Sequence, residues 1–173
     1  MKKSVLTSIV IAFAAMLAVQ SPVRVVAGPA EDVQTAMALL KSKAAALGKP
    51  NVKGEDAVAG KNVPAIYFGT TEMNNNFALV DEVTKEKGGT ATIFVKNGDD
   101  FVRVATNVKK DDGSRAIGTV LDPKGKAIAA ISKGKSFYGE VPILGKPYIT
   151  GYEPIRDASD KVIGVYYVGY LKK

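Results

Sequence analysis

The chain has 173 residues and a formal net charge of +7, and it contains no His, no Cys and no Trp. Its length fits one domain with one core, and without Cys it has no disulfides to stabilise it. The missing His and Cys remove the commonest general base and the commonest metal ligands. The composition therefore argues against His-based and metal-dependent enzymes and favours the binding of an anion.

The first 27 residues are typical of a secretory signal peptide. Met1-Lys2-Lys3 is a basic start, residues 9–19 form an apolar run, and Val25-Val26-Ala27 offers the small or apolar residues that a signal peptidase reads. The alternative is a membrane anchor, but a run of about 11 residues is shorter than the roughly 20 that a span needs. We expect cleavage after Ala27 and a periplasmic or secreted protein. The removed segment carries three basic and no acidic residues, so the mature chain is only mildly basic, which does not favour nucleic acid as a partner.

The mature chain begins with a predicted helix over residues 30–47. Apolar residues recur there at spacings of three and four, namely Val33, Met37, Leu40 and Ala44. Gly48 and Pro50 mark the end of the helix. Residues 49–62 are polar and contain glycine, which indicates a loop.

Short elements follow. Residues 63–68 predict a strand at a sheet edge, because Pro64 has no N–H to donate to a neighbour. Residues 77–85 predict one or two helical turns. Asn97-Gly98 favours a tight hairpin turn between strands 90–96 and 101–107.

The rest of the sequence predicts four more strands and one short helix. Asp122 is expected as the N-cap of this helix, with Pro123 at its first position and an end near Lys133. The strands are expected over residues 115–121, 137–143, 147–154 and 162–171. Hairpin-length connections imply antiparallel pairing, so the sequence predicts an α+β fold with one antiparallel sheet and a helix on one face.

Side chains alternate along strands, and the alternation mixes polar with apolar residues on the same face. One face of 101–107 is expected to carry Arg103 with Phe101, Ala105 and Asn107. One face of 148–154 carries Tyr148, Thr150 and Tyr152. Such faces are expected where a sheet lines a small pocket. The alternative is that the arginines reach along the surface and the tyrosines are core residues, and the pattern alone leaves both open.

Several of these segments resemble a Cache domain. The resemblance is carried by Thr92-Ile93-Phe94, by residues 100–108 from Asp-Phe-Val-Arg to Asn-Val, and by Gly-Ser-Arg-Ala-Ile-Gly-Thr at 113–119. It continues through residues 138–139, 144–150, 152–157, 162–164 and 167–169. The chain is similar to the single Cache domain of the Cache 3/Cache 2 fusion type, as in the periplasmic sensor domains of methyl-accepting chemotaxis receptors and sensor kinases.

The resemblance implies a PAS-like fold, in which a long N-terminal helix packs on a twisted antiparallel sheet of about five to six strands. It also implies a pocket for a small organic anion such as a short carboxylate. The polar positions that match the family, and that the resemblance implies as ligand-binding, are Arg103, Arg115, Lys146 and Tyr148, followed by Tyr138 and Thr150. An arginine fork fits a carboxylate with two parallel bonds, and a tyrosine hydroxyl can donate a further one. No catalytic residue, metal or cofactor is expected.

The expected organisation is a signal peptide at 1–27, an N-terminal helix and linker at 28–62, and a single Cache sensory domain at 63–173. The sequence shows neither the flanking membrane helices nor the signalling modules of the receptors. We therefore expect a free ligand-binding protein or co-sensor in signal transduction such as chemotaxis. It would be a monomer or weak homodimer that docks on a membrane receptor or sensor kinase. The alternatives are a protein-interaction or structural domain without a working pocket, and an enzyme, for which no supporting group of residues is found.

Overall fold

The computed structural model describes residues 28–173, so the expected signal peptide at 1–27 lies outside the described residues. Within residues 28–173, the elements in chain order are α1 (Pro29–Leu47), β1 (Pro50–Val58), β2 (Lys61–Phe68), β3 (Thr71–Glu72), α2 (Ala78–Lys87), β4 (Thr90–Asn97), β5 (Asp100–Thr106), α3 (Lys126–Ile131), β6 (Phe137–Ile143), β7 (Lys146–Arg156) and β8 (Val162–Leu171). No helix in this range has the length and apolar character that crossing a bilayer requires.

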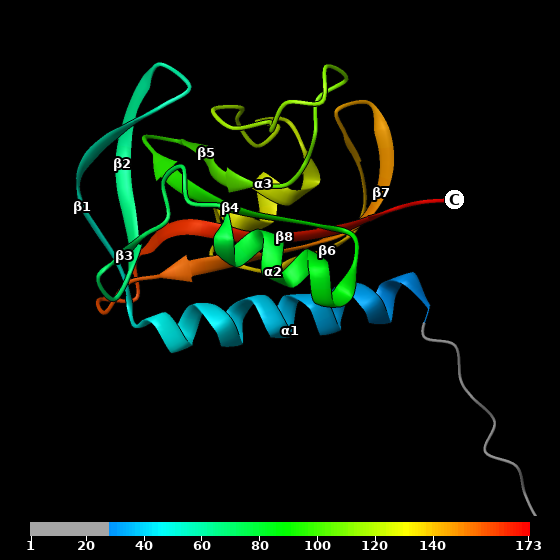
Figure 1. Cartoon of the computed structure of the whole chain (residues 1–173), viewed down its shortest axis with the longest axis horizontal. Coiled ribbons are helices and arrows are strands. Elements are labelled where there is room, and N and C mark those ends of the chain that lie inside the picture. The colour runs from blue at the N-terminus through cyan, green and yellow to red at the C-terminus, as the bar shows by residue number, and fades with distance from the viewer. Residues whose placement is uncertain (1–27) are drawn as a thin grey trace, which may run out of the picture.

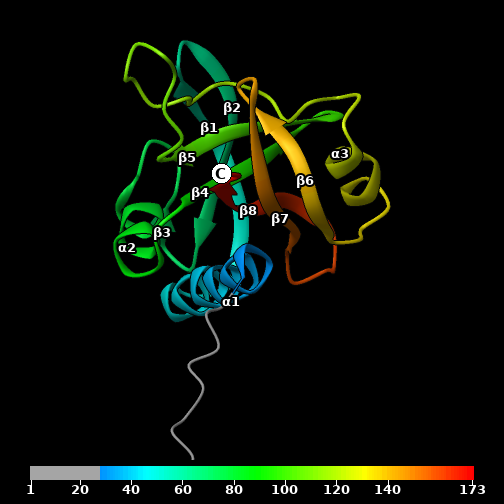
Figure 2. The ribbon, with the colours of Figure 1, turned by 90° about the vertical axis from the view of Figure 1, so that its right-hand side faces the viewer.

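A five-stranded antiparallel sheet forms the centre of the fold, in the order β5-β4-β8-β7-β6. Helices α1 and α2 cover one face of this sheet, and α3 lies on the other side (Figure 1, Figure 2). A second, three-stranded sheet in the order β1-β2-β3 stands at one end. The predicted α+β class, with a long N-terminal helix packed on a twisted antiparallel sheet, is confirmed.

The sheet separates two apolar cores. The first lies under α1 and α2 and includes Met37, Leu40, Phe68, Ile93 and Tyr166. The second lies on the α3 side and includes Phe94, Phe101, Ile131, Tyr152 and Tyr167. The predicted helix of residues 30–47 is confirmed as α1, and its apolar stripe of Val33, Met37, Leu40 and Ala44 is buried in the first core.

The second sheet corrects two expectations. Residues 49–62 were expected to form a loop, but they contain β1 and the start of β2. The strand signal was missing because all of β1 except Val58 is at least partly exposed, so no apolar alternation marks it. The strand around Pro64 was expected at an edge, but β2 pairs with β1 on one side and with β3 on the other.

An asparagine side chain extends the β3 side of this sheet where the backbone ladder stops. Asn74 Nδ2 donates to the carbonyl of Pro64 (3.2 Å), and Asn74 Oδ1 accepts from the backbone N–H of Ile66 (3.1 Å). The amide therefore supplies one donor and one acceptor, as a strand residue would. The next residue, Asn75, links the two sheets, because its backbone N–H donates to the carbonyl of Val104 in β5 (2.9 Å).

The segment before α3 also differs from expectation. Residues 115–121 do not form a strand, and they contact β5 through the isolated bridge of Val120 with Val102 and through single backbone hydrogen bonds. Helix α3 begins at Lys126 with Gly125 as its N-cap, not at Asp122. Asp122 Oδ1 instead accepts the backbone N–H of Lys124 (3.0 Å) in a turn.

The two side-chain hydrogen bonds of Asn74 predict an effect of this residue on the free energy of unfolding. We expect Asn74→Ala to lower the free energy of unfolding by about 2–3 kcal/mol, because it leaves the N–H of Ile66 and the carbonyl of Pro64 without partners. Urea unfolding measures the change. The matched control is Asn62→Ala, since this exposed side chain has no hydrogen bond among the described residues, and its effect should stay within about 0.5 kcal/mol. Equal effects of the two substitutions would contradict the stabilising role of the Asn74 hydrogen bonds.

Candidate functional site

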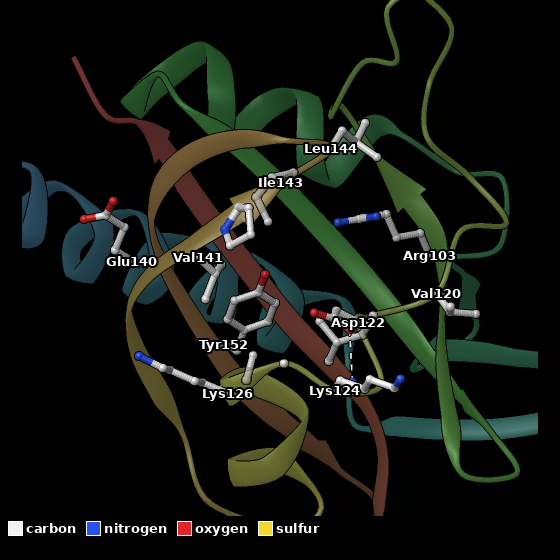
Figure 3. Close-up of a pocket in the computed structure, with 14 residues that line it drawn as sticks. Arg103, Val120, Asp122, Lys124, Lys126, Glu140, Val141, Ile143, Leu144 and Tyr152 are labelled. Carbon is white, nitrogen blue, oxygen red and sulfur yellow. Dashed lines mark hydrogen bonds between the residues drawn. The ribbon is translucent and has the colours of Figure 1, made fainter.

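A cavity of about 480 Å³ opens on the face of the main sheet that α1 does not cover. It lies between β5, the segment that leads into α3, and the edge strand β6 (Figure 3). The lining residues are Arg103, Val120, Leu121, Asp122, Lys124, Gly125, Lys126, Ala127, Glu140, Val141, Pro142, Ile143, Leu144 and Tyr152. Its size falls in the usual range of small-molecule sites.

Arg103 is the most unusual residue of this cavity. It is 5% exposed, and its guanidinium lies 5.0 Å from the centroid of the Phe94 ring in a cation–π contact. Its Nη1 donates to Thr119 Oγ1 (2.7 Å), and this hydroxyl in turn donates to the carbonyl of Ala116 (2.7 Å). Neutral groups alone therefore hold the guanidinium in place.

The charge of Arg103 has no counter-ion among the residues that the structure describes. No ion pair between residues 28 and 173 includes Arg103, and its Nε is buried without a hydrogen-bond partner. Burial lowers the pKa of Arg103, against a smaller opposing effect of the Tyr167 and Tyr152 phenols. A folded-state pKa below the unfolded one means that burying the protonated group costs free energy at neutral pH. An anion in the cavity would offset that cost.

Tyr152 supplies a second donor. Its ring is 1% exposed and packs against Tyr167, with 5.0 Å between ring centroids. Figure 3 shows the Tyr152 hydroxyl and the Arg103 guanidinium pointing into the same space. Burial, and next the neighbouring Tyr167, raise the pKa of Tyr152, so the hydroxyl is protonated at neutral pH. Sequence reasoning placed Tyr152 on the face of Tyr148 and Thr150 but did not select it.

The other charged side chains of the lining do not all point towards Arg103. The carboxylate of Glu140 and the ammonium groups of Lys124 and Lys126 point away from Arg103 (Figure 3). Glu140 pairs with Lys172 instead, 2.7 Å away. The carboxylate of Asp122 lies on the Tyr152 side of the cavity. Opposite Arg103, the wall is apolar and comes from the end of β6 and its turn, with Val141, Pro142, Ile143 and Leu144.

Arg115 does not line the cavity. Its Nη1 and Nη2 donate to the two carboxylate oxygens of Asp81 in α2 (2.7 and 2.8 Å), and Nη1 also donates to the carbonyl of Thr106 (2.8 Å). The guanidinium stacks 4.4 Å from the Phe77 ring centroid. Arg115 thus has the bidentate partner that Arg103 lacks, and it fastens the loop before residue 115 to α2.

The remaining expected residues also lie outside the lining. Lys146 is exposed at the start of β7, with Nζ 3.6 Å from Asp111 Oδ1. Tyr148 is half-buried against the second core. Tyr138 is on the α1 side, where its hydroxyl donates to Glu153 Oε1 (2.5 Å). Thr150 is buried and donates to the carbonyl of Gly139 (2.7 Å). Of the six expected residues, the structure places Arg103 alone at the cavity.

The described residues contain no group of His, Cys, Asp or Glu side chains arranged to hold a metal ion. A helix-backed antiparallel sheet with a small-molecule cavity on its far face defines an α+β ligand-binding domain. The family model of the Cache 3/Cache 2 fusion domain matches residues 26–173, so the chain belongs to this family. Cache domains are extracellular sensory and ligand-binding domains without catalytic activity. No curated protein matches the chain.

The two arginines predict opposite stability effects. We expect Arg103→Met to leave the free energy of unfolding within about 1 kcal/mol of wild type or to raise it, because it removes a buried charge without a counter-ion. Arg115→Met should lower it by about 1–2 kcal/mol, because it breaks a part-buried bidentate pair. Urea unfolding of the ligand-free proteins compares them. A larger loss from Arg103→Met than from Arg115→Met would show that the buried charge is not a net cost.

Proposed function

We propose that the chain is a periplasmic or secreted sensory domain that binds a small organic anion, a carboxylate, between Arg103 and Tyr152. The observation that carries this proposal is the buried guanidinium of Arg103, which borders a cavity and has no carboxylate partner within residues 28–173. Buried charges in proteins are normally paired, so an unpaired one at a cavity wall is a binding-site signal.

The two donors suit a carboxylate. A guanidinium can give two parallel N–H bonds to the two oxygens, and a protonated phenol can add a third donor. The hydrogen bond from Nη1 to Thr119 and the ring of Phe94 fix the position of the arginine before a ligand arrives. A fixed donor loses less side-chain entropy on binding, so more of the interaction energy contributes to affinity.

The affinity has an upper bound from ligand size. Small ligands gain at most about 1.5 kcal/mol per heavy atom, so a carboxylate of about six heavy atoms has a ceiling near 9 kcal/mol, or sub-micromolar affinity. We expect micromolar dissociation constants for two- to four-carbon carboxylates. A partner membrane receptor or sensor kinase would read the bound state, with the domain acting as a free binding protein or co-sensor.

A panel of carboxylates, with and without substituents at the α-carbon, tests the proposal. The protein is first unfolded and refolded to remove co-purified ligand and is then titrated by calorimetry and thermal shift. At a ligand concentration of about 100 Kd, binding should add about 2.7 kcal/mol to the free energy of unfolding. We expect at least one carboxylate to bind wild type, and Arg103→Met to weaken it by about 10- to 100-fold, the range for lost charge-assisted hydrogen bonds.

The control variant is Arg115→Met, which removes an equal charge outside the cavity and should leave ligand affinity unchanged. If no carboxylate binds refolded wild type, the anion-binding proposal fails, and a structural or interaction role without a working pocket becomes the better account. The proposal also fails if Arg103→Met binds the ligand as tightly as wild type does.

A further inference from the structure

Two exposed apolar side chains border the cavity from different walls. Leu144, in the turn between β6 and β7, is 46% exposed, and Val120, in the segment that leads into α3, is 39% exposed. In the view of Figure 3 they lie on either side of the Arg103 side chain. A single exposed apolar residue is ordinary on a protein surface, but two that border one cavity point to a shared role.

Leu144 also has an unfavourable backbone conformation. Ile143 pairs with Lys146, so Leu144 and Gly145 form a two-residue turn, with φ angles of 49° and 82°. Turns of this type favour asparagine or aspartate before the glycine, because other side chains are strained at positive φ. Leu144 is thus a large apolar side chain at a turn position that suits neither its backbone nor its exposure. Residues in such sparsely populated conformations cluster at ligand sites and switch regions.

The tip of the β6–β7 hairpin, residues 142–147, is weakly joined to the rest of the sheet. Strand β8 ends opposite Tyr148, with Leu171 as its last paired residue, so the tip extends beyond its neighbour. Pro147 has no N–H to donate to β8, and its carbonyl accepts the backbone N–H of Lys172 (2.9 Å). A two-stranded hairpin without a third strand is only marginally stable, so this tip can bend relative to the five-stranded sheet.

The two walls of the cavity mouth differ in how firmly they are held. Val120 is fixed to β5 by an isolated bridge. On the hairpin tip, Ile143 is buried in the second core, but residues 144–147 are exposed. The ion pair at the tip joins exposed side chains, Lys146 and Asp111, at 3.6 Å, and such pairs contribute little. The hairpin tip is thus the wall that can move.

We propose that the hairpin tip is a lid, which closes over an occupied cavity and brings Leu144 towards Val120. This rests on the proposed function, because the bound carboxylate is what the lid covers. A two- to four-carbon carboxylate is much smaller than a cavity of about 480 Å³, whereas binding sites usually bury most of a ligand's surface. Closure reduces the open space around such a ligand and buries apolar surface of both Leu144 and Val120.

The charge of Arg103 makes closure depend on the ligand. In the empty cavity, a closed lid would remove water from a guanidinium that has no counter-ion within residues 28–173, which costs free energy. A carboxylate supplies the counter-ion, and exclusion of water then strengthens its hydrogen bonds with Arg103 and Tyr152. The ligand therefore binds the closed form more tightly than the open one, and such a difference in affinity shifts the populations of the two forms.

Calorimetry of the refolded, ligand-free protein with acetate, pyruvate and butanoate tests the lid. For an acid that binds wild type, we expect Leu144→Gly to weaken binding by about 5- to 10-fold, because it removes the apolar cover. Glycine suits the positive φ, so this variant should fold. Leu144→Met keeps the apolar bulk, and its affinity should stay within about twofold of wild type.

The matched control is Ala59→Gly. Ala59 and Gly60 form the corresponding two-residue turn between β1 and β2, with φ angles of 50° and 78°, and this turn lies outside the cavity lining. The substitution makes the same kind of change in the same kind of turn, so it should leave the affinity for the acid unchanged.

A double-mutant cycle tests whether the two exposed side chains act together. Val120→Ala should weaken binding by about 2- to 5-fold, because it removes part of the surface that the closed lid contacts. The double variant with Leu144→Gly should lose clearly less affinity than the product of the two single losses, since the contact between these residues is lost only once.

Spin labels measure the movement directly. The chain contains no Cys, so labels attach only to introduced cysteines. The pair Lys146→Cys and Lys124→Cys uses exposed positions on the hairpin tip and on the opposite side of the cavity, and the distance between its labels should shorten when a binding acid is added. The pair Lys124→Cys and Ser159→Cys, with Ser159 exposed in the turn between β7 and β8, should keep its distance.

The outcomes separate the lid from the proposed function. If none of the three acids binds wild type, the proposed function fails for two- to four-carbon carboxylates, and the lid fails with it. If an acid binds wild type and Leu144→Gly equally well, or leaves the distance between the labels at positions 124 and 146 unchanged, the lid is overturned and the carboxylate proposal stands. Losses that multiply in the double variant would overturn the contact between Leu144 and Val120, and the lid with it.

Discussion

The candidate site depends on a guanidinium that is buried in the domain and held by neutral groups. Backbone bonds fix Arg103 to the irregular segment beside β5, since its N–H donates to the carbonyl of Thr119 and its carbonyl accepts from Gly118 (both 2.9 Å). The Thr119 hydroxyl then reaches Nη1. Thr119 positions the charge but does not neutralise it, and no ion pair within residues 28–173 includes Arg103.

A β-bulge determines which side chains share the cavity face. The register between β4 and β5 shifts between Ile93 and Phe94, so that Phe94 lies opposite Arg103 and Ile93 opposite Ala105. As a result Ala105 joins the first core, although simple alternation placed it beside Arg103. The bulge thus brings the Phe94 ring under the guanidinium, and it shows how one extra residue redirects the side chains beyond it.

Much of the fold could be predicted from the sequence, because local patterns encode it. Helix α1 follows from its apolar spacing, and the β4–β5 hairpin follows from Asn97-Gly98. Strand β1 and the irregular residues 115–121 could not be predicted, because β1 buries little and residues 115–121 are organised by single bonds to β5. No local pattern marks Asn74 as a sheet residue, and its role becomes visible only once β2 lies beside it.

The site was harder to predict than the fold, and the two arginines show why. Arg103 and Arg115 are equal in residue type and in family resemblance, yet one is unpaired in a cavity and the other is bound to Asp81. The distinction is made by a carboxylate 34 positions earlier in the chain, on α2, so no local pattern reveals it. Tyr152 was missed for the same reason, since alternation gave its face but not which of the two tyrosines on that face, Tyr148 or Tyr152, meets the cavity.

Strand β6 connects the cavity to α1. Val141 and Ile143 of β6 line the cavity, while Tyr138 of the same strand donates to Glu153 on the opposite face. Glu153 also accepts from Lys41 of α1 (2.5 Å), so a chain of side chains runs from the edge strand to the helix. Because β6 pairs only with β7, it has fewer backbone bonds to resist displacement than the central strands have. The cavity and α1 are thus linked through the side chains of one edge strand and Glu153.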